Sequence, residues 1–179
     1  ELDPAISVPE TFGDPAAVHS AVPDPVDAID RLLNPDIATV AERAMADWRQ
    51  QTAGWPTQVI HTDYYPANVL VAGDAVSGIL DFEYAGRGHR AMDVAIGLAA
   101  FSNKRWDDWS WPVCRAFAEG YLRRLPLNRD ELEAMPALML AREVTSLVHW
   151  LGRHARGLTD RADIEDRGSR LLALDRWID

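Results

Sequence analysis

Three short apolar runs in the middle of the chain interrupt a pattern that is otherwise helical. The runs cover residues 58–60, 69–71 and 76–82 and are rich in β-branched and other apolar side chains. Gly73-Asp74 lies between the last two runs and predicts a tight hairpin turn there. From about residue 90 onward the apolar residues recur at helical spacing. The sequence therefore predicts an α+β domain that is mostly helical and contains a small β-hairpin.

Helix caps and prolines divide the rest of the chain into expected helices. The expected ranges are 26–33, 37–51, 91–101, 107–123, 137–155 and a last helix that reaches Trp177. Asp36 is the expected N-cap of the second helix, and Asn128 the expected N-cap of a short one. Pro136 favours the start of a new helix, and Gly157 is typical of a helix end.

The first 25 residues differ from the rest in composition. Residues 1–25 contain five prolines and few periodic apolar positions, which predicts a linker or an N-terminal extension. We expect residues 26–179 to form the folded domain. Since the chain begins with Glu1 rather than Met, we interpret it as an excised piece of a longer protein.

The charge and cysteine content narrow the classes of function. The chain has 18 basic and 28 acidic residues, and this net charge of −10 argues against nucleic acid or an anionic membrane as a partner. No apolar run approaches the length of about 20 residues that a membrane span needs, and no signal peptide is visible. The single cysteine, Cys114, excludes an internal disulfide and a multi-cysteine zinc site. We expect a cytoplasmic protein.

One group of polar residues lies around the predicted hairpin. His61-Thr62-Asp63 is followed by Asn68, five residues after Asp63, and by Asp81, thirteen residues after Asn68. Phosphoryl transfer needs an acceptor hydroxyl placed in line and a divalent metal that neutralises the phosphate oxygens. A carboxylate near the hydroxyl meets the first need, and amide and carboxylate oxygens are ligands that Mg²⁺ prefers. The hairpin is expected to bring the three oxygen donors together at one end.

This spacing matches the kinase pattern H-R-D-x-x-x-x-N followed by D-F-G, with Thr62 in place of Arg and Glu83 in place of Gly. Residues 61–68 together with residues 81–86 resemble the aminoglycoside phosphotransferase and choline kinase superfamily. The resemblance implies the C-terminal lobe of a protein-kinase-like fold, with a small catalytic β-hairpin. It also implies an enzyme that uses ATP and Mg²⁺ to phosphorylate an alcohol.

Two branches of the superfamily are similar in more detail. Residues 81–93 are similar to choline and ethanolamine kinases, and residues 77–82 with the following helix resemble bacterial homoserine kinases. The recognisable part spans about residues 57–101. The flanking segments match the C-terminal lobe of the superfamily only in that they are also expected to be helices.

The resemblance implies a role for each residue of the motif. Asp63 would be the catalytic base or the carboxylate that orients the hydroxyl, and Asn68 and Asp81 would hold Mg²⁺ and, through it, ATP. His61 would support the loop, and Asp93 would brace it through backbone hydrogen bonds. A carboxylate in the first turn of a helix also interacts favourably with the helix dipole, which is a purely structural alternative for Asp93.

Two departures from the superfamily pattern matter. Thr62 stands where many members have Gly. The ATP-clamping N-terminal lobe is missing, since neither G-x-G-x-x-G nor G-x-x-x-x-G-K-[ST] occurs in the 179 residues. We therefore expect the N-terminal lobe of the same protein to be a partner of this chain. Alone, the chain is expected to bind ATP poorly and to catalyse little.

The sequence leaves the acceptor open among homoserine, choline-like alcohols, sugars and aminoglycosides. The leading hypothesis is an amine-bearing acceptor, and tryptophans are able to hold an ammonium by cation–π attraction. The residues considered for this role are Trp106, Trp109, Trp111 and Trp150, and the carboxylates considered are Glu143, Asp163 and Glu165. Tryptophans at helical spacing are also typical of a core. Two other functions remain: a non-catalytic kinase-like binding or regulatory module, and a metal-dependent hydrolase.

Overall fold

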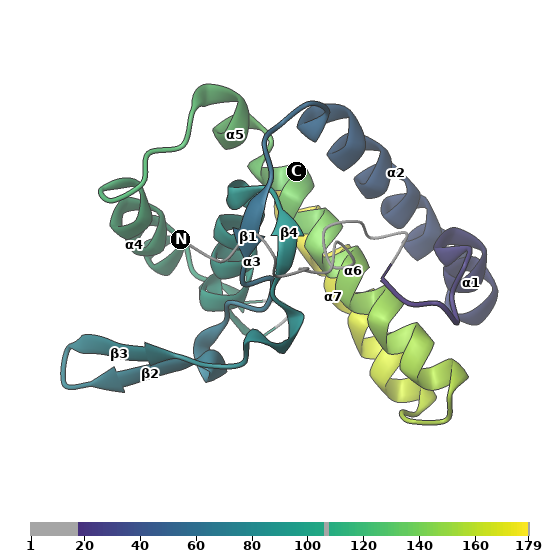
Figure 1. Ribbon diagram of the computed structural model, residues 1–179. Helices are drawn as coiled ribbons and strands as arrows, with labels where there is room; N and C mark the ends of the chain where they lie inside the picture. Colours follow the sequence, from purple (N-terminus) through teal and green to yellow (C-terminus); the bar gives the residue numbers. More distant parts are fainter. Residues whose placement is uncertain (1–17, 106–107, 179) are drawn as a thin grey trace, which may run out of the picture.

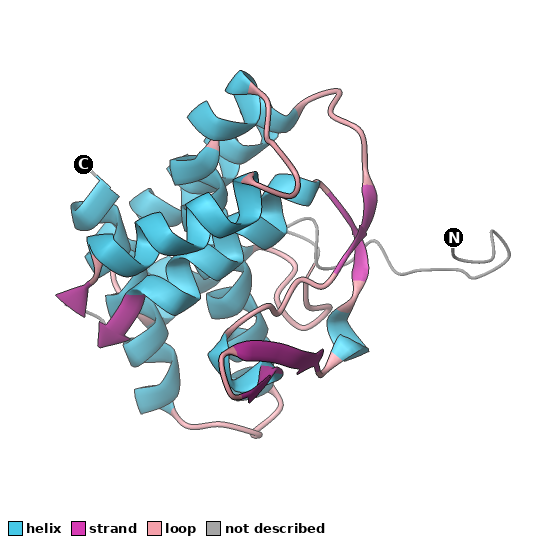
Figure 2. Cartoon of the chain, turned by 90° about the vertical axis from the view of Figure 1, so that its left-hand side faces the viewer, coloured by secondary structure: helices cyan, strands magenta, loops and turns pink. Residues whose placement is uncertain are grey.

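The computed structural model describes residues 18–105 and 108–178. Within these ranges, helices form the body of the molecule and short strands lie around its edge (Figure 2). This arrangement confirms the predicted α+β, mostly helical class. The predicted linker falls largely outside the described residues, as do Trp106 and Asp107. In the described part of the chain, no helix combines the length and apolarity that crossing a membrane would require.

The longest helix, α6 (Met135–Ala155), lies at the centre of the core. It packs against α2, α3 and α7, and Figure 1 shows α6 and α7 side by side. Leu138, Val144, Leu147 and Val148 on α6 are fully buried. Pro136 occupies the first turn as predicted, where its missing N–H costs nothing. Gly157, with φ of +70°, follows the helix end in the left-handed conformation that favours glycine.

The two N-terminal helices are α1 (Pro25–Leu32) and α2 (Pro35–Thr52), and each carries a proline in its first turn. The predicted cap of α2 is wrong by two residues. Asn34, rather than Asp36, is the N-cap, and its side-chain oxygen accepts hydrogen bonds from the N–H groups of Asp36 at 2.7 Å and Ile37 at 3.2 Å. Pro35 sets the start of the helix because it suits the first helical position. Asp36 therefore lies in the first turn.

The strands form separate antiparallel pairs. β1 (Gln58–Ile60) pairs with β4 (Gly86–Gly88), and β2 (Val69–Ala72) pairs with β3 (Ala75–Ile79). The second pair is the predicted hairpin, with Gly73 in its turn at φ +61°. It projects from the helical body (Figure 1). The predicted strand over 76–82 is too long, because β3 ends at Ile79 and a 3₁₀ turn follows at Phe82–Tyr84.

The segment after α3 (Arg90–Ser102) corrects another predicted boundary. The helix predicted over 107–123 begins only at Trp111 and ends at Leu122, and it is labelled α4. Before it, β5 (Asn103–Arg105) and β6 (Asp108–Trp109) form a short antiparallel pair. The proline at position 112, in the first turn of α4, explains the later start.

The predicted cap at Asn128 is confirmed. Asn128 caps α5 (Arg129–Glu133) in a capping box with Glu131, and Glu131 also accepts hydrogen bonds from Arg90 at 2.6 and 2.7 Å. This ion pair ties the start of α3 to α5. The final helix, α7 (Arg161–Ile178), begins after Asp160, whose side chain accepts a hydrogen bond from the Asp163 N–H at 3.1 Å.

A glycine allows α3 and α4 to pack closely. A Cβ added at Gly97 of α3 would collide with the Phe117 ring of α4, reaching two further ring carbons at 2.9 Å. Gly97→Ala is therefore expected to lower the free energy of unfolding by about 1–3 kcal/mol, as overpacking does in other cores. Urea denaturation measures this loss.

Gly120→Ala on α4 is the matched control. A Cβ there would meet only the Arg123 Nη2 atom, at 3.8 Å, so the space is open. Alanine also has the better helix propensity, by about 1 kcal/mol at most. Gly120→Ala should leave stability unchanged or slightly raised. Equal losses in the two variants would mean that the Gly97–Phe117 contact does not limit the packing.

Candidate active site

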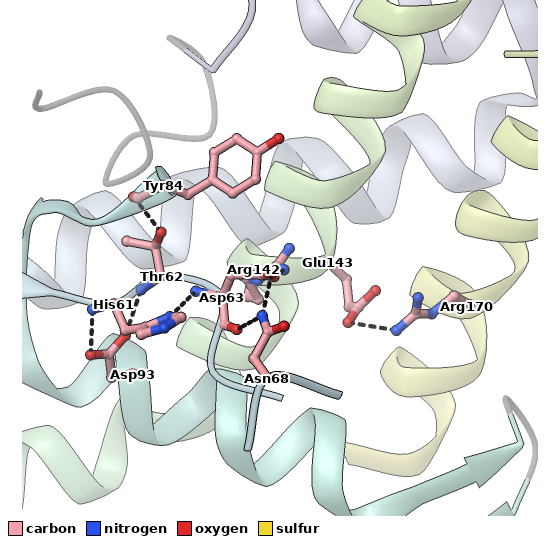
Figure 3. Close-up of polar contacts among 9 residues, drawn as sticks. All are labelled: His61, Thr62, Asp63, Asn68, Tyr84, Asp93, Arg142, Glu143 and Arg170. Carbon is pink, nitrogen blue, oxygen red and sulfur yellow. Dashed lines mark hydrogen bonds and ion pairs between the residues drawn. The ribbon is translucent and has the colours of Figure 1, made fainter. Parts of the chain in front are cut away.

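The loop after β1 is held by a carboxylate from α3. The Asp93 side chain accepts two backbone hydrogen bonds, from the His61 N–H to Oδ2 at 2.8 Å and from the Thr62 N–H to Oδ1 at 2.9 Å (Figure 3). Burial raises the pKa of Asp93, and the two backbone donors oppose that rise because they favour the charged form. The carboxylate thus satisfies two donors that would otherwise have no partner in a dry environment.

The next residue, Thr62, has an unusual backbone conformation. Its φ is +64° and its side chain is fully buried. This left-handed region suits glycine and is costly for a β-branched residue, which explains why Gly is common at this position in the superfamily that the sequence resembles. The Thr62 hydroxyl donates a hydrogen bond of 2.6 Å to the Tyr84 carbonyl oxygen. That bond and the two from Asp93 hold the strained loop in place.

His61 links the loop to the end of the hairpin. Its Nε2 lies 2.9 Å from the Leu80 carbonyl oxygen, and its Nδ1 accepts a hydrogen bond of 3.3 Å from the Asp63 N–H. These partners place the ring proton on Nε2. The ring also packs on Phe82, with centroids 4.5 Å apart. The two hydrogen bonds of His61 thus engage backbone groups at the end of the hairpin and in the loop.

Asp63 has hydrogen-bond donors on both carboxylate oxygens. Its Oδ2 accepts a bond of 3.0 Å from Asn68 Nδ2, and its Oδ1 accepts a bond of 3.1 Å from Arg142 Nη2. Figure 3 shows Asp63 between these two partners. Asn68 Nδ2 also donates to the Asp63 carbonyl oxygen at 3.0 Å. The carboxylate therefore has a defined orientation, as a group that must place an acceptor hydroxyl would need.

Asn68 and Asp81 are brought close through the backbone. The Leu80 N–H donates a hydrogen bond of 2.9 Å to the Asn68 carbonyl oxygen, and Asp81 follows directly with φ of +65°. Since Asn68 Nδ2 is engaged with Asp63, its amide oxygen remains to face a cation. The Asp81 residue is exposed. Hard oxygen donors of this kind fit Mg²⁺, which takes one or two protein ligands and completes its shell with phosphates and water.

A cavity of about 530 Å³ lies next to Asp63 and is bordered by α3, α6 and α7. Four arginines and two carboxylates line it: Arg142, Arg153, Arg167, Arg170, Asp63 and Glu143. Arg142 pairs with Asp63, and Arg170 lies 3.4 Å from Glu143. Burial lowers the pKa of Arg170 to about 10, so its guanidinium stays charged at neutral pH. The cavity wall therefore has more positive than negative side chains.

The arginines of the cavity were not predicted, although the sequence contains a signal for them. Positions 142, 143, 146, 149, 150 and 153 follow each other at helical spacing and are all polar or aromatic, in a helix whose other positions are apolar except for Thr145 and His154. Such a stripe marks one helix face that does not join the core. Arg167 and Arg170, three residues apart on α7, complete the wall.

The residues considered for an amine site lie in different places. Glu143 and Trp150 line the cavity. Trp109 and Trp111 instead stack on Trp177, each with centroids 4.6 Å apart, and so contribute to packing.

The two remaining carboxylates of that set, Asp163 and Glu165, lie on the exposed surface of α7. Asp163 accepts a hydrogen bond from Thr159, and Glu165 pairs with Arg161. Trp106 lies outside the described residues.

Comparisons with known proteins relate the sequence of this chain to phosphotransferases. A model of the phosphotransferase enzyme family matches residues 17–135. The homoserine kinase of Bradyrhizobium sp. (strain ORS 278) is 38% identical over 117 residues, which cover 61% of this chain and 36% of that protein. The homoserine kinase of Agrobacterium fabrum (strain C58) is 32% identical over 141 residues, covering 76% of this chain and 43% of the other.

A third relative extends the match further. The homoserine kinase of Acidiphilium cryptum (strain JF-5) is 30% identical over 152 residues, which cover 83% of this chain and 47% of that protein. The chain thus spans between about a third and a half of the length of these curated relatives.

Proposed function

Since the chain belongs to the phosphotransferase enzyme family, we propose that it is the catalytic lobe of a kinase that transfers the γ-phosphoryl group of ATP to a hydroxyl of a small molecule. Family membership confirms the resemblance that residues 57–101 suggest. We expect the enzyme to act in the cytoplasm.

The observation that carries this proposal is the placement of Asp63. Its carboxylate lines the cavity and is oriented by Asn68 on one oxygen and Arg142 on the other. An acceptor hydroxyl in the cavity would donate its hydrogen bond to this carboxylate, which would take up the proton as the oxygen attacks phosphorus. Positioning of this kind is the main contribution that a protein makes to phosphoryl transfer.

Asn68 and Asp81 are the residues that we propose to hold Mg²⁺. The Leu80 N–H, one residue before Asp81, donates a hydrogen bond to the Asn68 carbonyl oxygen, and both side chains contain oxygen atoms that are able to bind a cation. The bound ion would supply positive charge against the phosphate oxygens of ATP. The two residues would thereby place the nucleotide on the side of Asp63 where the hairpin lies.

The other half of the nucleotide site is proposed to come from an N-terminal lobe of the same protein, with residues 1–25 as the connection and residues 26–179 as the C-terminal lobe. The relatives are more than twice as long as their matched parts. The β2–β3 hairpin is an argument for a docked partner, because four of its apolar side chains are between 40% and 64% exposed: Leu70, Val71, Val76 and Ile79. Clusters of exposed apolar side chains are typical of an interaction surface.

We propose an amine-bearing alcohol as the acceptor, with homoserine as the first compound to test because the relatives are homoserine kinases. Glu143 is the residue best placed to receive the ammonium group. It lines the cavity, and its Oε2 atom has no hydrogen-bond partner among the described residues. A buried carboxylate oxygen without a donor is costly, and an ammonium group would satisfy it.

The test is to incubate the full-length protein with L-homoserine, ATP and MgCl₂ and to follow the products by ³¹P NMR. We expect a phosphate monoester of homoserine together with ADP, and no product when EDTA removes the metal. Release of inorganic phosphate without an acceptor product would favour the hydrolase alternative. Absence of both nucleotide turnover and nucleotide binding would favour a non-catalytic module.

A further inference from the structure

We propose that Arg153 and Arg167 form a subsite for an anionic group of the acceptor, a carboxylate, and that this subsite selects hydroxy acids over neutral alcohols. The inference rests on the proposed function, because it concerns the acceptor that the Asp63 cavity would bind. It concerns residues outside the recognisable family motif, since neither arginine belongs to residues 57–101.

The charge balance of the cavity is the first observation. Four guanidinium groups face two carboxylates there, in a chain whose formal net charge is −10. Arg142 pairs with Asp63, and Arg170 pairs with Glu143. Among the described residues, Arg153 and Arg167 form no direct ion pair with a carboxylate, although Arg167 attracts Asp163, four residues earlier on α7, at longer range. Two cations that are left over in a cavity favour an anionic ligand that would complete the pairing.

The second observation is that both guanidiniums lie over the ring of Trp150. The Arg153 guanidinium carbon lies 5.4 Å, and that of Arg167 4.7 Å, from the centroid of the Trp150 ring. Stacking on an indole fixes the position of a guanidinium without neutralising its charge. Arg153 Nε is also buried and has no hydrogen-bond partner among the described residues. The Trp150 ring therefore helps to fix each guanidinium, and the buried Nε donor of Arg153 is available to a carboxylate.

The neighbouring His149 is consistent with a positive potential at this end of the cavity. Burial lowers the pKa of His149, and nearby positive groups, Arg153 first among them, lower it further. The imidazole therefore adds no positive charge at neutral pH, and the arginines remain the anion-binding groups.

Two sources could supply the anionic group, the acceptor carboxylate or a phosphate of ATP. The position of the subsite favours the acceptor. Arg153 and Arg167 belong to α6 and α7, whereas the proposed Mg²⁺ ligands Asn68 and Asp81 lie at the end of the hairpin. The two sources predict different kinetic effects, because only one substrate should bind more weakly when the arginines are replaced.

The experiment compares L-homoserine with 2-amino-1,4-butanediol, in which an alcohol replaces the carboxylate, as substrates of the full-length protein. We expect kcat/KM to be at least about 30-fold higher for homoserine, the effect of losing one partner of a desolvated charge pair. Arg153→Gln and Arg167→Gln should each raise the KM for homoserine and reduce this preference. The KM for ATP should stay unchanged, and the activity on the diol should fall much less than the activity on homoserine.

Two further variants separate charge recognition from a general loss of structure. Arg167→Lys keeps the charge and should retain part of the preference for homoserine. Arg161→Gln removes an arginine from the same helix, α7, where it forms an exposed ion pair with Glu165. It should leave both substrates unaffected. Thermal melting of each variant confirms that it is folded.

Equal kcat/KM values for homoserine and the diol in the wild-type protein would overturn the inference and leave the proposed function standing. A rise in the KM for ATP in Arg153→Gln or Arg167→Gln would overturn it too, and would assign the arginines to the nucleotide. If neither compound is phosphorylated, the proposed function is wrong for this acceptor. Calorimetric titration with L-homoserine alone then decides the subsite: binding that both Gln variants abolish supports it, and no binding overturns it.

Discussion

Asp63→Asn is expected to reduce kcat for phosphoryl transfer by about 10²–10⁴-fold, the range typical of a lost general base. The asparagine cannot take up the hydroxyl proton. It also conflicts with its neighbours, because both carboxylate oxygens of Asp63 accept hydrogen bonds, from Asn68 Nδ2 and from Arg142 Nη2. In either orientation, the new NH₂ group would face one of these donors. The measurement is steady-state turnover of the full-length protein with homoserine, ATP and MgCl₂.

The control for loss of one negative charge is Asp30→Asn. Asp30 is exposed on α1 and does not line the cavity. Its replacement should leave turnover unchanged. Thermal melting should show that both variants are folded, since only surface or cavity groups are altered. Near-normal turnover of Asp63→Asn would remove Asp63 from its proposed role.

Asp93→Ala is the second variant with a large expected effect, here on stability and turnover together. It removes the acceptor for two backbone N–H groups, those of His61 and Thr62, in a buried part of the loop. Leaving such donors without a partner should lower the free energy of unfolding by about 2–4 kcal/mol. Because Thr62 holds a left-handed backbone through these bonds, turnover should fall as well. Urea denaturation and steady-state kinetics measure the two effects.

Asp27→Ala tests the alternative that Asp93 acts only through the helix dipole. Asp27 also lies in the first turn of a helix, α1, but its side chain is exposed and pairs with Arg31 at 3.5 Å. Its loss should cost at most about 1 kcal/mol, the combined size of a dipole and a surface ion-pair effect. If Asp93→Ala costs no more than Asp27→Ala and leaves turnover intact, the loop-bracing role is wrong.

Features that depend on near neighbours in the chain were predictable from the sequence. The hairpin follows from two apolar runs separated by Gly73-Asp74, and the cap of α5 follows from Asn128. The resemblance of residues 61–68 together with residues 81–86 predicted the phosphotransferase family, which the family match confirms. The two wrongly predicted helix starts also have local causes. Two prolines moved the starts of α2 and α4, because the position of a proline in the first turn outweighed the cap and the periodicity that suggested other starts.

The side chains that line the cavity could be identified only from the tertiary structure. Asp63 and Arg142 are 79 residues apart in sequence and form an ion pair at 3.1 Å, and Asp93 reaches His61 across 32 residues. The net charge of −10 argues against anionic partners, whereas the packing of α6 against α7 gathers four arginines around the cavity.

What the sequence by itself determined is therefore the local structure and the family, because turn chemistry, helix periodicity and motif spacing are encoded within a few residues. What only the tertiary structure decided is which charges face one another across the cavity. The reason is physical: the sign of a pocket is set by the side chains that packing brings together from separate helices, and the net charge of the chain does not report it.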